Sequence, residues 1–98
     1  MSEFNKPVIM MRLDIRFDNG TRQFIKEAFD LPASFHWHRG LWINDPADEG
    51  GFRVEAVYVA SDGSGTIVFE ERFEQPMEEV AVTEWTNFGW ALRGSQHE

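Results

Sequence analysis

The stretch that decides the fold is IMMRLDIRF, residues 9–17 of a 98-residue chain. Apolar side chains occupy every odd position of this stretch, and the even positions from Arg12 to Arg16 are charged. A period of two places alternate side chains on opposite faces of a β-strand. The sequence therefore predicts a strand with one face toward the core and one polar face.

Three further segments show strand patterns between turn signals. In residues 35–44, Phe35, Trp37, Leu41 and Ile43 share one face with Arg39, and the other face carries His36, His38, Gly40, Trp42 and Asn44. Residues 52–60 and 66–75 flank a turn rich in Gly, Ser and Asp, which predicts a hairpin. Val57 and Val59 make the first arm of this hairpin apolar on both faces, as is typical of a central strand.

Residues 21–31 leave two alternatives open. Asn19-Gly20 predicts a hairpin with residues 9–17, whereas Phe24, Ala28 and Leu31 follow helical spacing. We expect a hairpin that becomes irregular or helical before Pro32.

The last segment predicts a helix over about residues 77–93. Pro76 suits the start of a helix, and Glu78 and Glu79 fall in its acidic first turn. An apolar stripe at spacings of three and four runs along it, formed by Met77, Ala81, Trp85, Phe88 and Leu92. The expected fold class is therefore α+β: a single antiparallel sheet of four or five strands, covered on one face by this C-terminal helix. Residues 1–98 are expected to form one compact domain, with residues 1–6 and 95–98 frayed.

Composition excludes several classes of protein. The chain has no cysteine, so disulfides, thiolate metal sites and cysteine nucleophiles are excluded. No apolar run approaches the roughly 18 residues of a membrane helix. Nine Lys and Arg against seventeen Asp and Glu give a net charge of −8, which opposes direct binding to nucleic acid. The N-terminal residues have no signal-peptide pattern, so we expect a cytoplasmic protein.

The acidic residues concentrate in the second half of the chain. Residues 1–50 carry six basic and eight acidic side chains, and residues 51–98 carry three and nine. An acidic surface attracts a basic partner, although it also serves solubility alone. The predicted partner-binding residues are the carboxylates of this stretch and two tryptophans on faces opposite the expected core: Glu70, Glu74, Glu78, Glu79, Trp90 and Trp42.

His36 and His38 are weak candidates for a metal site. Two residues apart in a strand, they would project together, but no nearby pattern supplies a third ligand. Glu84 lies within the predicted apolar helix stripe. A carboxylate there would pair with Arg39, act as a general acid or base, or indicate that the helix starts later than predicted.

Two hypotheses for function follow. The first is a small, acidic, non-enzymatic interaction protein that binds a basic protein surface. Inhibitors, immunity proteins and nucleic-acid mimics of similar size and charge are the analogous classes of protein. We expect no cofactor. The alternative is a small-ligand-binding or enzymatic domain with a pocket between sheet and helix, using His36, His38 and Glu84. We expect the domain of the alternative hypothesis to be a dimer, and a homodimer is possible under the first hypothesis as well.

Overall fold

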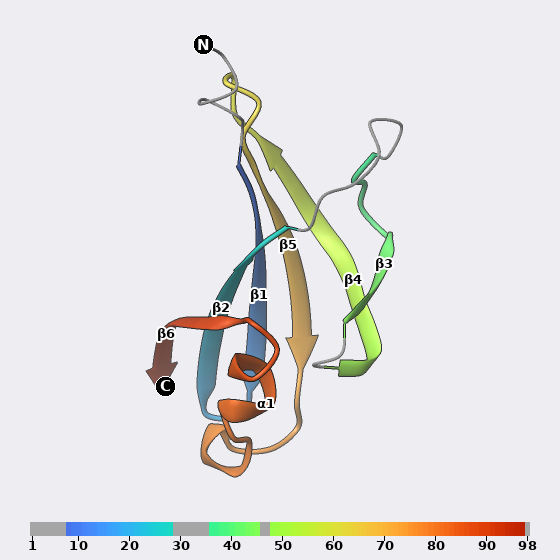
Figure 1. Cartoon of the computed structure of the whole chain (residues 1–98). Helices are drawn as coiled ribbons and strands as arrows, with labels where there is room; N and C mark the ends of the chain where they lie inside the picture. Colours follow the sequence, from blue (N-terminus) through green and yellow to red (C-terminus); the bar gives the residue numbers. More distant parts are fainter. Residues whose placement is uncertain (1–7, 29–35, 46–47, 98) are drawn as a thin grey trace.

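The computed structural model describes residues 8–28, 36–45 and 48–97, and one six-stranded sheet dominates it (Figure 1). The order of strands across the sheet is β3-β4-β5-β1-β2-β6. The six strands are β1 (Ile9–Phe17), β2 (Gly20–Glu27), β3 (Trp42–Asp45), β4 (Asp48–Val59), β5 (Gly65–Arg72) and β6 (Ala91–His97).

The sheet is mixed, so the prediction of a purely antiparallel sheet of four or five strands is wrong. β1 pairs with β5 in parallel, and the other neighbouring pairs are antiparallel. The parallel register sets Met11 opposite Ile67 and Leu13 opposite Phe69, so the apolar positions of both strands share one face. The predicted hairpins of β1 with β2 and of β4 with β5 are both present.

The predicted C-terminal helix over residues 77–93 is also wrong. In its place stand a single 3-10 turn, η2 (Met77–Glu79), a four-residue helix, α1 (Thr83–Thr86), and strand β6. Val80 has an extended backbone and separates the two turns, and Gly89, with φ of 93°, follows α1. Met77 and Trp85 fit a helical period, but two short turns bury both side chains as well as one long helix would.

Residues 21–27 form part of strand β2, so the choice between a hairpin and a helix in residues 21–31 is decided as far as Glu27. Phe24 lies opposite Leu13 in the hairpin and is fully buried, so the hairpin alternative is confirmed there. Residues 29–31 lie outside the described residues. The predicted strand 35–44 shortens to β3, because residues 36–41 are irregular.

Strand β6 replaces the frayed end expected for residues 95–98. Ser95 pairs with Arg22, and Gln96 pairs with Thr21. The close approach depends on Gly20, since a Cβ at this position would lie 2.0 Å from the carbonyl oxygen of Gln96. Residues 1–6 and Glu98 lie outside the described residues.

The two faces of the sheet differ in chemistry. The apolar face carries the core, and the segment of residues 73–90, here called the covering segment, packs on it through Met77, Val80, Trp85 and Trp90. Figure 1 shows η2 and α1 at one end of the sheet, far from the turn that joins β4 and β5. The opposite face, here called the polar face, carries alternate residues of each strand, including Arg12, Asp14, Arg16 and Glu70.

The molecule is elongated, with extents of 47 × 23 × 23 Å. No helix within the described ranges is both long and apolar enough to cross a membrane.

Candidate functional site

The covering segment is fixed to the sheet by the turn between β1 and β2. The Asn19 side chain accepts a hydrogen bond from the Met77 backbone N–H at 2.7 Å and donates one to the Glu78 carboxylate at 2.9 Å. The guanidinium of Arg22 donates to the Val80 carbonyl. These bonds satisfy backbone groups that a segment without regular secondary structure would otherwise leave unpaired.

Aromatic packing holds the rest of the covering segment. Trp85 lies 5.3 Å from Phe24 between ring centroids, and Trp90 makes an edge contact with Phe52 at 5.7 Å. The Lys26 ammonium lies 5.6 Å from the Trp90 ring, a cation–π distance. Burial of these two indole rings therefore sets which side of the segment faces solvent.

The solvent side of the covering segment is acidic. Glu74, Glu78, Glu79 and Glu84 are all exposed, and we call these four carboxylates the acidic surface. Residues 73–92 contain no Lys, Arg or His that could neutralise them from within the segment. Phe88 lies beside α1 and is 43% exposed, so an apolar side chain accompanies the charges.

The structure separates the residues predicted to bind a partner. Trp90 is 2% exposed, so its assignment as an outward anchor is wrong: the residue after Gly89 turns inward onto Phe52. Trp42 is 61% exposed on β3, opposite Arg53. Glu70 lies on the polar face, away from the covering segment, and Arg16 approaches it at 3.9 Å.

The exposure of Phe88 differs from the prediction made from its sequence pattern. Its position in the apolar stripe of a predicted helix assigned it to the core. The burial of Trp90 in its place follows from a backbone turn at Gly89, which hydrophobic spacing does not encode.

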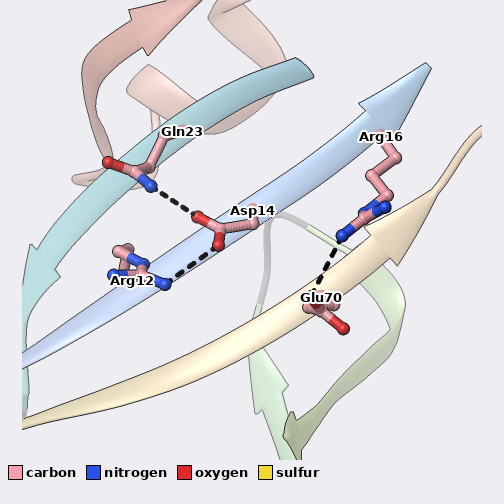
Figure 2. A network of polar contacts seen from close by, with 5 residues as sticks. All are labelled: Arg12, Asp14, Arg16, Gln23 and Glu70. Carbon is pink, nitrogen blue, oxygen red and sulfur yellow. Dashed lines mark hydrogen bonds and ion pairs between the residues drawn. The ribbon is translucent and has the colours of Figure 1, made fainter. Parts of the chain in front are cut away.

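The polar face holds a small network of charged and amide groups (Figure 2). The Asp14 carboxylate accepts hydrogen bonds from Arg12 at 3.1 Å and from Gln23 at 2.9 Å. Charges of both signs alternate here, with Arg16 beside Glu70 in the same view. The pairs Arg12–Asp14 and Arg16–Glu70 therefore bring charges of opposite sign together on this face.

The histidine pair forms no metal site with its described surroundings. His36 and His38 are exposed, and no group of three or more His, Asp or Glu side chains within the described ranges could hold a metal ion. The Nδ1 atom of His38 lies 3.0 Å from the Arg39 carbonyl oxygen.

Of the three alternatives for Glu84, a later start of the helix agrees with the structure, because α1 begins at Thr83 and leaves Glu84 exposed rather than in the core. The helix that placed it there is absent. His36 lines a hollow of about 270 Å³ at the end of the sheet with Trp37 and Val57, and Glu84 is not among the lining residues. The three polar residues of the alternative hypothesis therefore do not share this pocket.

No protein-family model, no curated protein and no solved structure matches this chain.

Proposed function

We propose that this chain is a non-enzymatic interaction protein that binds a basic macromolecular surface through the acidic surface and Phe88. The observation that carries the proposal is the exposure of four carboxylates on a segment with no basic residue between positions 73 and 92. Such a surface raises the rate of encounter with a positively charged partner and weakens as salt screens it.

Phe88 adds an apolar contact, which the carboxylates cannot provide. Exposed charges contribute little net affinity, whereas an aromatic ring transferred from water to an interface contributes strongly. The bonds from Asn19 and the buried Trp85 hold the covering segment in one conformation, which lowers the entropy lost on binding. Trp42 and Glu70 lie on the polar face, so we leave them outside this contact.

The proposal is tested with two triple charge reversals of equal charge change. Glu74→Lys, Glu79→Lys and Glu84→Lys alter the acidic surface but spare Glu78 and its bond to Asn19. The matched control is Glu27→Lys, Glu55→Lys and Glu70→Lys, which changes carboxylates on the strands. Circular dichroism first establishes that both variants are folded.

Each protein is then immobilised and exposed to native lysate at low and high salt. We expect a stoichiometric basic partner that wild type and control retain, and that the acidic-surface variant and high salt release. Phe88→Ala should weaken the same complex at constant charge. Equal loss of the partner by both triple variants, or no partner at either salt concentration, would contradict the proposal.

A further inference from the structure

The end of the sheet farthest from the covering segment exposes apolar side chains. We call this region the tip and define it as residues 8–10 and 57–66. Val8 is 48% exposed, Tyr58 60% and Val59 74%. Val59 and Val8 lie on either side of Gly65, since Val59 is opposite Gly65 and the Gly65 N–H donates to the Val8 carbonyl at 3.2 Å, and all three apolar side chains line one hollow.

The sheet topology explains this exposure. β3 pairs with β4 only as far as Arg53, so the last part of β4 has no strand on its outer side among the described residues. η2 and α1 cover the other end of the sheet (Figure 1). A hollow of about 470 Å³ lies at the tip on the face opposite the core, because Met10, Thr66 and Tyr58 are aligned across three strands; Val8 and Ala60 also line it.

The tip is almost free of charge in a chain of net charge −8. Residues 8–10 and 57–61 contain no charged side chain, and Asp62 in the turn is the one charged residue from position 56 to position 69. Two copies of an acidic chain repel one another wherever their carboxylates meet. Among the described residues, the uncharged tip is a surface where two copies can bury apolar area without bringing carboxylates together.

We propose that two copies of this chain form a homodimer in solution through their tips. An isologous contact uses the same self-complementary surface on both copies. The tip offers such a surface, because Tyr58 is 60% exposed and lines one hollow together with Val8 and Met10. A twofold axis then inserts the Tyr58 ring of each copy into the hollow of the other.

This inference is independent of the proposed function. The acidic surface lies at the opposite end of the molecule and stays free in such a dimer (Figure 1). A dimer would present two acidic surfaces, so a partner with repeated basic sites would bind with avidity.

The first measurement is sedimentation velocity of the full chain from about 1 to 300 µM. We expect the mass to rise with concentration from 11.4 kDa toward twice that value. Because salt screens the repulsion between acidic chains, higher salt should tighten the dimer. A monomer at every concentration would overturn the proposal.

Two variants locate the contact. Tyr58→Lys places a charge in the tip and should raise the dissociation constant at least about tenfold, the effect of losing one buried aromatic contact. Phe88→Lys is the matched control, because Phe88 is also exposed but lies on the covering segment. Both substitutions are at exposed positions, and thermal melts establish that the variants are folded. An equal loss of dimer in both variants would overturn the assignment to the tip.

A spectroscopic label gives a readout that needs no substitution. The chain contains one tyrosine, so 3-fluorotyrosine places a single fluorine label at Tyr58. Its ¹⁹F signal should shift or broaden over the concentration range in which the mass doubles. An invariant signal during dimer formation would show that the copies meet elsewhere.

Discussion

At the scale of single residues, Asp14 joins the polar contacts at the middle of the polar face. It accepts hydrogen bonds from Arg12 and Gln23, and both members of its ion pair with Arg12 are more than two-thirds buried, with side-chain exposures of 30% and 24%. The Nε atom of Arg12 is buried without a partner within the described residues, so Asp14 is the group that stabilises the guanidinium charge. Removing it leaves buried donors unpaired.

Asp14→Ala should therefore destabilise the fold by about 1–2 kcal/mol, the cost of leaving partly buried donors unsatisfied. Arg53 and Glu55 form an ion pair with the same two-residue spacing on β4, at 2.9 Å, in which Glu55 is as buried as Asp14, with side-chain exposure of 23%, but the Arg53 side chain is 53% exposed. Glu55→Ala should cost less than Asp14→Ala, about 0.5 kcal/mol, because the Arg53 guanidinium that loses its partner is exposed to water, whereas that of Arg12 is mostly buried. Urea unfolding of the two variants measures the difference. Equal costs would show that Asp14 stabilises no more than a surface charge does.

Asp62 gives a prediction on pH. The Ser64 side chain donates to its carboxylate at 2.6 Å and the Ser64 backbone N–H at 2.9 Å, and these bonds lower the pKa of Asp62 below its usual value. A lowered pKa in the folded state means that the turn is stabilised above the unfolded pKa. This contribution is lost as the pH falls through the folded pKa. Carboxyl NMR titration should show the pKa of Asp62 rising in Ser64→Ala, and an unchanged pKa would refute the role of Ser64.

Among the helices and strands, the predictions are correct where a sequence pattern fits only one kind of secondary structure, and wrong where it fits more than one. The alternation in residues 9–17 and the turn at Asn19-Gly20 are local, and β1 and β2 form as predicted. The apolar spacing of residues 77–93 fits a helix, yet two short turns bury the same kind of side chains. Strand β6 was not predicted, because apolar and polar residues do not alternate in its sequence, ALRGSQH, and its side chains are mostly exposed.

The candidate site was predictable to the same extent. Charge counting found the exposed carboxylates Glu74, Glu78 and Glu79, because glutamate is rarely buried. Which tryptophan faces outward depends on the turn at Gly89, and no periodicity reports that turn. The separation of Glu70 from the other carboxylates depends on the parallel pairing of β5 with β1, a contact between residues far apart in the chain.

Two glycines of the contact between β2 and β6 allow a matched test of how β6 packs. A Cβ at Gly20 would meet the Gln96 carbonyl oxygen, whereas a Cβ at Gly94 meets nothing within 4 Å. Gly20→Ala should cost about 2–4 kcal/mol, since the backbone of β6 must move away. Gly94→Ala should be neutral or stabilise by up to about 1 kcal/mol, because alanine restricts the unfolded chain. Urea unfolding decides this, and similar costs at both sites would contradict the close approach of β6 to Gly20.

At the scale of the whole molecule, the core is concentrated at one end of an elongated sheet. The fully buried rings of Phe24, Phe52, Phe69, Trp85 and Trp90 lie under or within the covering segment, whereas the tip has exposed apolar side chains. Local stability follows the density of buried contacts, so the two ends should open with different free energies.

Hydrogen exchange of two backbone amides tests this difference. The Gly65 N–H donates to Val8 at the tip, and the Phe73 N–H donates to Arg16 at the covered end, both across the contact of β5 with β1. In dilute solution, Gly65 should exchange about 10- to 100-fold faster than Phe73, relative to the intrinsic rates, for a difference of about 1.4–2.7 kcal/mol in opening free energy. Equal protection would show that the sheet opens as one unit.

The dependence of exchange on protein concentration at the same two amides distinguishes the local stability of the monomer from dimer formation. If the tips of two copies pack together, raising the protein concentration removes solvent from Gly65 and stabilises its closed state by mass action. The exchange of Gly65 should then slow with concentration while Phe73 changes little, because the covered end lies outside the contact. Parallel slowing of both amides would indicate a dimer that stabilises the whole sheet. A rate that changes at Phe73 alone would place the contact on the covering segment, where the acidic surface opposes it.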